Sequence, residues 1–314
     1  VTGSLGVTLY PADDADPETL LRHADQAMYR AKVLGGNGYM LFDPDREQEI
    51  KALQARRKAL SRALLNDEFV LYYQPQIDPR TRRAIGVEAL IRWQHPEQGL
   101  LAPHAFLPTI AGSDLELAFD AWVLRTALRQ LEAWLAQSLS LGVCINLTPK
   151  SLTQDGFVDT LRATLAAHPR VPPKLLCLEV LESTALDDFQ AATRVMRDCR
   201  ALGVQVALDD FGTGYSSLAY LRNLPVDVIK VDRSFVMSML EREHDLAIVE
   251  SVIYLAKRFG KQVVAEGVES AAHSERLQAM GCDLLQGFGI ARPMPGEALP
   301  AWCQAFADGR QNVT

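Results

Sequence analysis

Short apolar runs alternate with polar or amphipathic segments from Phe69 almost to the end of the chain. Each run has the length of a buried strand, and the later runs are separated by segments with the apolar spacing of helices. Eight runs stand in the sequence, at residues 69–74, 85–91, 143–147, 175–181, 204–209, 228–231, 262–266 and 284–287. Helices are predicted at 189–202, 246–259 and 273–280. This alternation predicts βα units around a parallel sheet.

The number of runs indicates a closed barrel. Eight βα units over roughly 240 residues match the size of a TIM barrel. The first run is followed by a second strand-like stretch instead of a helix, so we expect an irregular start, with the first strand antiparallel to its neighbour. The predicted fold class is an α/β modified TIM (β/α)8 barrel at 67–305, with a tail at 306–314. A short α/β piece and a linker helix precede it.

Residues 1–66 follow a different pattern. Residues 1–10 are typical of a strand and 17–33 of an amphipathic helix. One strand and one helix cannot bury a core alone, so we interpret 1–43 as the remnant of a domain. Residues 44–66 predict a charged helix with a sparse apolar stripe, either a linker packed on its neighbour or a coiled coil between protomers. Since the chain starts at Val1 without Met, inside a predicted strand, we expect a piece of a longer protein.

Composition and charge narrow the class of protein. The 314 residues carry a formal net charge of −7, which argues against binding a nucleic acid polymer, because that needs a basic surface. No apolar run approaches the roughly 18 residues of a membrane span. The five cysteines lack CxxC spacing, so we expect a reduced, cytoplasmic protein. The six histidines are never paired at i, i+4, which argues against a zinc site.

A polar residue stands at or near the end of every predicted strand. In a barrel these ends converge on the face where active sites form. Any one such residue could be a helix N-cap or an ion-pair partner. Together they include so many carboxylates that they would repel each other unless cations lay among them. The polar residues are Gln74, Glu88, Asn146, Glu179, Asp209, Lys230, Glu266 and Gln286, with Asp210 directly after Asp209.

Apart from Lys230, these side chains offer carboxylate and amide oxygens, which are the ligands of hard cations. They favour Mg²⁺ or Mn²⁺, with Ca²⁺ as a possible competitor. The adjacent Asp209 and Asp210 could serve two ions, the arrangement that suits phosphodiester hydrolysis. Lys230 has two compatible interpretations, a counter-ion or a group that orients the attacking water. Because acidic neighbours raise a lysine pKa, we favour positioning over proton abstraction.

These residues resemble the EAL family of cyclic di-GMP phosphodiesterases over about 67–305. The name-giving motif stands as Glu88-Ala89-Leu90. The other motifs follow in order: Tyr73-Gln74-Pro75, Asn146-Leu147, Glu179 and Glu182, Asp209-Asp210-Phe211-Gly212-Thr213-Gly214-Tyr215-Ser216-Ser217-Leu218, Ile229-Lys230-Val231-Asp232, Ala265-Glu266-Gly267-Val268-Glu269 and Gln286-Gly287-Phe288. The resemblance implies hydrolysis of cyclic di-GMP to linear pGpG with two Mg²⁺ or Mn²⁺ ions, inhibited by Ca²⁺.

The resemblance also implies individual roles. Lys230 orients or activates the nucleophile, and Glu182 holds the loop after Asp210. Glu266 serves as a metal ligand or holds the water. Gln74, Arg92 and Gln286 contact the substrate or water on the metal, and the planar guanidinium of Arg92 suits a phosphate. The implied metal ligands are Glu88, Asn146, Glu179, Asp209, Asp210 and Glu266.

Two positions depart from the family pattern. Leu181 stands where a Thr usually precedes Glu182, so a hydroxyl near the loop is lost. Ala111 and Gly112 replace a common acidic pair, so contacts to the guanine or to a partner could differ. Residues 1–43 resemble the end of a GGDEF (diguanylate cyclase) domain, through Ser4-Leu5-Gly6-Val7, Ala24-Asp25-Gln26-Ala27-Met28-Tyr29 and Ala31-Lys32.

Two other functions compete with hydrolysis. A degenerate EAL domain would bind cyclic di-GMP without cleaving it, but such members usually lose a metal ligand or the lysine, and this chain keeps them. A metal-dependent lyase or aldolase could use a similar barrel, although its chemistry usually needs one metal beside a Lys or His base. We also expect a homodimer, because EAL domains commonly pair through barrel helices and the linker helix has an apolar stripe.

Overall fold

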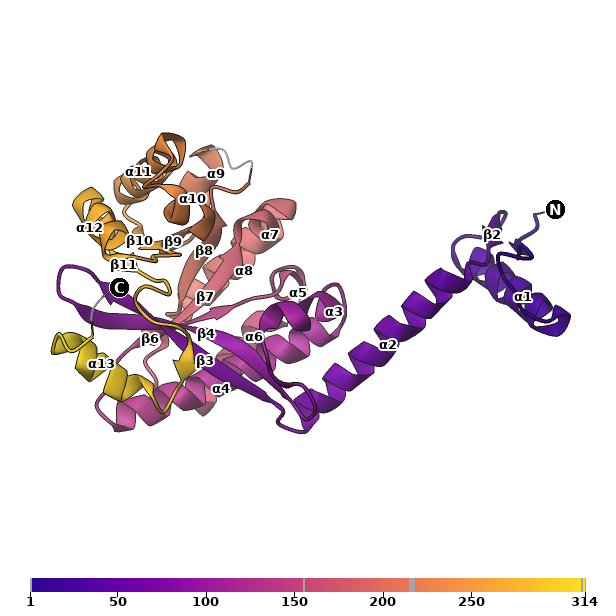
Figure 1. Ribbon diagram of the computed structural model, residues 1–314, viewed down its shortest axis with the longest axis horizontal. Coiled ribbons are helices and arrows are strands. Elements are labelled where there is room, and N and C mark those ends of the chain that lie inside the picture. The colour runs from indigo at the N-terminus through magenta and orange to yellow at the C-terminus, as the bar shows by residue number, and fades with distance from the viewer. Residues whose placement is uncertain (1, 155, 215–217, 312, 314) are drawn as a thin grey trace. The chain divides into compact units, whose positions relative to one another are not determined.

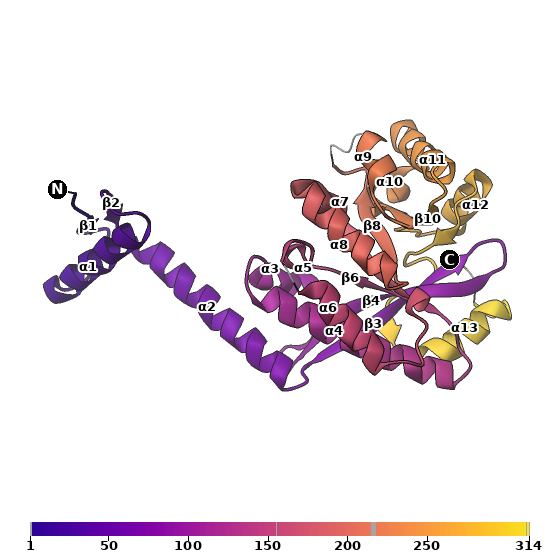
Figure 2. The same ribbon diagram turned by 180° about the vertical axis from the view of Figure 1, so that it is seen from behind.

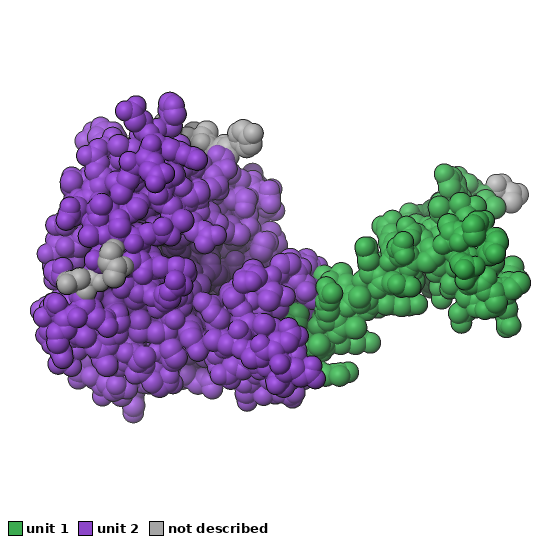
Figure 3. Space-filling model, in the orientation of Figure 1, with its two compact units in different colours: residues 1–62 green, residues 63–314 purple. Residues whose placement is uncertain are grey.

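The computed structural model describes residues 2–154, 156–214, 218–311 and 313. The chain divides into two compact units, residues 1–62 and residues 63–314 (Figure 3). Tyr215, Ser216 and Ser217, which belong to the loop motif after Asp210, lie outside the described residues.

The smaller unit is built on a βαβ arrangement. Strand β1 (Leu5–Val7) pairs in parallel with β2 (Tyr39–Leu41), and α1 (Pro17–Val33) connects them. The Asp16 side chain caps α1 by accepting a hydrogen bond of 3.0 Å from the backbone N–H of Thr19. The sequence pattern predicted α1 correctly but not β2, because three residues are too few to show a strand period. Helix α2 (Pro44–Leu65) follows β2.

The larger unit contains a closed barrel, as predicted. Ten strands form one sheet, in which β5 (Gly99–Leu101) and β12 (Met294–Pro295) are short edge strands and the other eight close the barrel. Strand β3 pairs antiparallel with both β4 and β11, which confirms the expected irregular start. The barrel strands are β3 (Phe69–Asp78), β4 (Arg83–His95), β6 (Gly142–Asn146), β7 (Leu176–Leu181), β8 (Gln205–Phe211), β9 (Val228–Val231), β10 (Gln262–Ala265) and β11 (Leu284–Leu285).

The first two strands are longer than their apolar runs. Gln74 pairs in register with Glu88, and β4 continues beyond Glu88 to His95, where it pairs with β5. These two residues therefore lie in the middle of their strands, and the expectation that they stand at strand ends is wrong. The reason is that β3, β4 and β5 pair with one another beyond the parallel part of the barrel, so their ends do not mark its rim.

Helices surround the barrel strands (Figures 1 and 2). The predicted helices at 189–202, 246–259 and 273–280 are confirmed as α8 (Phe189–Ala201), α11 (Glu243–Arg258) and α12 (Ala271–Met280). In the part of the chain that is described, no helix combines the length and apolar character needed to cross a bilayer. The remaining helices are α3 (Leu107–Ile110), α4 (Leu115–Ala136), α5 (Pro149–Thr153), α6 (Phe157–Ala167), α7 (Glu182–Asp187), α9 (Leu218–Asn223), α10 (Arg233–Ser238) and α13 (Leu299–Ala307), with 3-10 turns η1 (Pro103–Ala105) and η2 (Pro173–Leu175).

The barrel interior is arranged in layers with a spacing of two residues. A buried apolar cluster holds Cys177, Ala207, Val228, Val264 and Leu284. Each of these residues stands two positions before a candidate site residue, which lies on the same strand or directly after the end of that strand. Since side chains two apart share a face of a strand, the apolar layer lies directly below the polar one. The polar layer above it consists of Glu179, Asp209, Lys230, Glu266 and Gln286.

The residues between these layers face outward, against the helices. Leu208 is fully buried, and its strand β8 packs against α8. We expect Leu208→Ala to lower the free energy of unfolding by about 2–5 kcal/mol, because the lost side chain leaves a cavity. Urea unfolding followed by circular dichroism measures this. As a control, Arg197→Ala changes an exposed residue on α8 and should change the free energy of unfolding by less than about 0.5 kcal/mol. Equal effects would contradict the assigned packing.

Candidate active site

The Lys230 ammonium lies at the centre of a group of carboxylates inside the barrel. Its Nζ is 2.6 Å from Glu266 Oε1, 2.9 Å from Glu179 Oε2, 3.1 Å from Asp209 Oδ1 and 3.5 Å from Glu88 Oε2. The lysine side chain is only 1% exposed. The ammonium group, carried by β9, is thus surrounded by carboxylates from β4, β7, β8 and the segment after β10.

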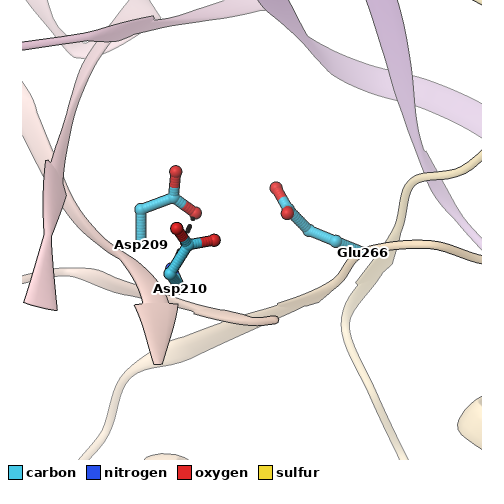
Figure 4. A group of neighbouring side chains, drawn as sticks. All are labelled: Asp209, Asp210 and Glu266. Carbon is cyan, nitrogen blue, oxygen red and sulfur yellow. Dashed lines mark hydrogen bonds between the residues drawn. The ribbon is translucent and has the colours of Figure 1, made fainter. Parts of the chain in front are cut away.

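Asp209, Asp210 and Glu266 also form a group of metal-binding size. Each offers a carboxylate oxygen, and these oxygens lie within 4.8 Å of one another. Figure 4 shows the two aspartates side by side at the end of β8, with Glu266 directed toward them from the opposite side. We call Glu88, Glu179, Asp209, Asp210 and Glu266 the carboxylate cluster.

A β-bulge allows two consecutive aspartates to serve the same site. Neighbouring residues of a regular strand face opposite sides, but the pairing of β8 with β9 shifts between Leu208 and Phe211. Asp210 has a φ of 54°, which is rare outside glycine, and its N–H donates to Asp209 Oδ1 over 3.0 Å. This turn of the backbone brings both carboxylates to one side.

Amide side chains hold Glu88 in place. Gln286 Nε2 donates to Glu88 Oε2 over 2.6 Å, and Asn146 Nδ2 donates to Glu88 Oε1 over 2.8 Å. Gln286 in turn accepts from Gln76 Nε2 at 2.9 Å and donates to Gln74 Oε1 at 3.2 Å. Gln286 therefore contacts Glu88 directly, and Gln74 is linked to Glu88 through Gln286.

Glu179 is the least satisfied member of the cluster. It is buried, and neither carboxylate oxygen accepts a hydrogen bond from the described residues. Lys230 Nζ is close to its Oε2 but lacks the alignment of a hydrogen bond. A buried carboxylate in this position requires a cation or a proton. Together with the all-oxygen donor set, this fits a hard divalent metal.

Burial and the closeness of the charged groups also shift the pKa values of the cluster and of Lys230. Burial pushes the pKa of Glu88 upward, but Lys230 and the hydrogen bonds from Gln286 and Asn146 hold it below its ordinary value. Burial and the charge of Glu88 raise the pKa of Glu179 well above its ordinary value. Burial acts to lower the pKa of Lys230, but the surrounding carboxylates raise it well above its ordinary value. The ammonium therefore keeps its proton.

Asp232 is a further member of the site that the sequence reasoning did not select. Burial and the charges of Asp209 and Asp232 raise the pKa of Asp210 to about 6, and Asp232 also shares a hydrogen bond with Asp210. The signal was present in the sequence, because Asp232 stands two positions after Lys230. Its side chain also caps α10 by accepting from the N–H of Ser234 at 3.0 Å.

Glu182 lies at the start of α7 and holds the loop after Asp210. Its Oε2 accepts a hydrogen bond of 2.9 Å from the N–H of Gly212. A Cβ at Gly214 would lie 3.2 Å from the Glu182 carboxyl carbon, so a larger residue would crowd this contact. The two departures from the family pattern, Leu181 and Ala111, line one mostly apolar cavity of about 370 Å³ together with Asn146.

Arg92 lines a second cavity, beside the cluster. This cavity has a volume of about 280 Å³ and is also lined by Gln74, Glu88, Glu266 and Gln286. The Arg92 guanidinium is half-buried, donates to the carbonyl of Ile91 and lies 5.7 Å from the centre of the Tyr72 ring. We call this the Arg92 cavity. With it, the candidate site residues other than Glu182, which contacts the loop at Gly212, lie at or beside the carboxylate cluster.

The free energy of unfolding of the metal-free chain should depend on pH, because the cluster releases protons as the pH rises. Burial raises the pKa of Glu266 to about 8, and that of Asp210 is about 6, against ordinary values of 4.5 and 3.8. Between these limits the folded chain binds more protons than the unfolded chain. In chelator, the free energy of unfolding should therefore fall as pH rises from about 5 to about 9.

Urea unfolding at three pH values, with chelator or with Mn²⁺, measures this dependence. A bound cation replaces the protons, so Mn²⁺ should flatten the profile. In chelator, Asp210→Asn should remove only the part of the fall below about pH 6, because Glu266, with its pKa of about 8, remains. Asp198→Asn, at an exposed position on α8, should leave the profile unchanged. A profile in chelator that is flat in the unmodified chain would contradict the assigned shifts.

Comparison with known proteins places this geometry in a family. The EAL domain matches residues 57–293, and the diguanylate cyclase GGDEF domain matches residues 1–38. The chain is 40% identical over 306 residues to the bifunctional diguanylate cyclase/cyclic di-GMP phosphodiesterase MucR of Pseudomonas aeruginosa, covering 96% of this chain and 44% of that protein. It is 37% identical over 309 residues to the cyclic di-GMP phosphodiesterase NbdA of the same organism, covering 98% and 39%.

A solved structure agrees with these matches. The PaMucR phosphodiesterase in complex with c-di-GMP superposes with a TM-score of 0.75 at 40% identity, covering 78% of this chain and 99% of that one. The chain spans less than half the length of the two curated relatives. The chain therefore belongs to the EAL domain family, with part of a GGDEF domain ahead of the barrel.

Proposed function

We propose that this chain hydrolyses cyclic di-GMP to linear pGpG. The observation that carries the proposal is the carboxylate cluster, in which Asp209, Asp210 and Glu266 offer oxygens within 4.8 Å of one another beside Lys230. Membership of the EAL family supports the substrate, because the relatives MucR and NbdA are named cyclic di-GMP phosphodiesterases. Hydrolysis breaks one P–O3′ bond, water supplies the new phosphate oxygen, and the 3′ oxygen leaves with a proton.

Two divalent ions, Mg²⁺ or Mn²⁺, would supply Lewis acidity toward the phosphate and the attacking water. Asp209 lies next to both Lys230 and Asp210, so its carboxylate is suited to serve two ions. Ca²⁺ should inhibit, because it accepts longer and more numerous oxygen contacts than Mg²⁺. The proposed ligands are Glu88, Asn146, Glu179, Asp209, Asp210 and Glu266.

The remaining residues position these ligands and the reactants. Lys230 stays protonated at neutral pH, as its raised pKa requires, so it orients the water and offsets negative charge instead of abstracting a proton. Gln74 and Gln286 fix Glu88 through the hydrogen bonds that join all three side chains. Glu182 holds the loop at Gly212, and Arg92 contacts the substrate from the neighbouring cavity.

The decisive experiment incubates the purified chain with cyclic di-GMP and Mg²⁺ or Mn²⁺ and separates the products by chromatography. We expect pGpG, and we expect Ca²⁺ or chelator to suppress it. Intact substrate that nevertheless binds would contradict hydrolysis and make the chain a cyclic di-GMP receptor. The loop held by Glu182, next to Leu181, would then be the first place to seek the cause.

Single substitutions test the assigned roles. Glu88→Ala and Lys230→Ala should each lower kcat by about a thousandfold or more, because each removes charge that the reaction needs in place. Arg197→Ala changes an exposed residue on α8 and should leave kcat within about twofold. Undiminished turnover in either site variant would refute its role, provided that circular dichroism shows an unchanged fold.

We further propose that the chain forms a homodimer in the reducing cytoplasm. Exposed apolar side chains on and between α10 and α11 support pairing through barrel helices, since Met237, Leu240 and Tyr254 are each more than 40% exposed. The five cysteines are free thiols, which suits a reducing compartment. Sedimentation at tens of micromolar should show a dimer, and Leu240→Glu should shift it toward monomer. A monomer in the unmodified chain would refute the dimer.

A further inference from the structure

Two buried carboxylates that do not belong to the carboxylate cluster lie near the start of α4. Glu116 and Asp120 stand one helical turn apart and are 3% and 4% exposed. Among the described residues, they accept hydrogen bonds only from backbone N–H groups and hydroxyls. Burial raises the pKa of Asp120 to about 6, and the charge of Glu116 acts in the same direction. Because like charges at i and i+4 destabilise a helix, the pair indicates a role beyond α4 itself.

Asp120 holds the turn that leads from β6 into α5. Its Oδ2 accepts a hydrogen bond of 3.0 Å from the N–H of Thr148 and one of 2.7 Å from the Thr148 hydroxyl. The hydroxyl of Ser151 donates to the same oxygen over 2.6 Å. Thr148 and Ser151 lie on either side of the first turn of α5. One carboxylate of α4 therefore fixes the start of α5.

Glu116 joins the same turn to a second one. Its Oε2 accepts a hydrogen bond of 3.2 Å from the N–H of Lys150, and its Oε1 accepts one of 2.5 Å from the N–H of Gly112. Gly112 lies in the turn between α3 and α4, where its φ is 70°. Ala111 and Gly112 carry no carboxylate, so the one that this turn contacts comes from Glu116. A single side chain thus connects the turn before α4 with the turn after β6.

These contacts fix the backbone that follows Asn146, a proposed metal ligand. Asn146 is the last residue of β6, and the pairing of β6 with β4 and β7 fixes the backbone before it. The N–H of Leu147, directly after it, donates to the carbonyl of Glu179 over 2.9 Å. Asn146 is exposed, and its Nδ2 donates to Glu88, so its Oδ1 would bind an ion. Because little packing holds an exposed side chain, the direction of Oδ1 depends on the backbone on both sides of Asn146.

We propose that Glu116 is a positioning residue for metal binding, because it fixes the segment after Asn146 and thereby holds the Asn146 carboxamide in place for a divalent ion. The inference rests on the proposed metal ligands. Groups that orient a metal ligand raise metal affinity, since less conformational freedom is lost when the ion binds. Without the Glu116 carboxylate, Asn146 loses part of its orientation while the carboxylate cluster stays intact. The loss therefore falls on metal affinity more than on turnover with metal bound.

Titration of the chain with Mn²⁺ alone, followed by calorimetry or by electron paramagnetic resonance of free Mn²⁺, tests the role without requiring turnover. Glu116→Gln keeps the side-chain length, but its amide nitrogen cannot accept a hydrogen bond, so one of the two N–H groups loses its partner. Mn²⁺ affinity should fall by about tenfold, the lower end of the range for groups that orient a metal ligand. The Mn²⁺ concentration for half-maximal turnover should rise by the same factor, whereas kcat at saturating Mn²⁺ should stay within about threefold.

Asp114→Asn is the matched control. It removes an ion pair of 2.6 Å between Asp114 and Lys150 that joins the same two segments, but through an Asp114 side chain that is fully exposed. Exposed ion pairs contribute little, so Mn²⁺ affinity should stay within about twofold.

Two results would overturn the role of Glu116. One is unchanged Mn²⁺ affinity in Glu116→Gln, even with a lower free energy of unfolding, because the contacts would then be merely structural. The other is an equal loss of affinity in Asp114→Asn. If the unmodified chain binds Mn²⁺ tenfold more tightly than Glu116→Gln but leaves cyclic di-GMP intact, hydrolysis is refuted and the role of Glu116 is supported. An unmodified chain that binds no Mn²⁺ would refute both.

Discussion

The structure of the barrel interior depends on one buried ammonium. Lys230 is the positive charge that allows Glu88, Glu179, Asp209 and Glu266 to lie within 3.5 Å of a common point. Without a cation, carboxylates this close would have to take up protons or separate. The lysine alone is insufficient, as the unsatisfied oxygens of Glu179 and its raised pKa indicate. The charge that is missing is the charge that divalent metals would bring.

The strand period connects this electrostatic demand to the fold. An apolar side chain two positions before each polar one fills the barrel below the site, so water is excluded from that side. The low polarity that makes the cluster costly also strengthens every charge interaction within it. Amide side chains then hold Glu88 at the position where its strand crosses the site. The position of Glu88 along its strand therefore determines its position in the site.

Most of the fold could be predicted from the sequence, because the eight apolar runs and the helical segments between the later ones carry a strong periodic signal. The antiparallel first strand followed from the missing helix between the first two runs. Other features depend on tertiary contacts that leave no period. Gln74 and Glu88 lie in mid-strand because β3 and β4 pair beyond the barrel. The bulge that turns Asp210 toward Asp209, and the contact of Glu116 with Lys150, appear only when segments far apart in sequence are adjacent.

The separation of charges within the site explains how an acidic protein can bind an anionic ligand. Net charge governs long-range attraction, and −7 opposes the approach of a phosphate. At contact distance, however, the local charges decide. Carboxylates occupy the barrel interior, where metals can neutralise them, whereas the guanidinium of Arg92 lines the adjoining cavity. The overall charge opposes the approach of polyanions such as nucleic acids. The local charges are those that the proposed binding of a small anion would require.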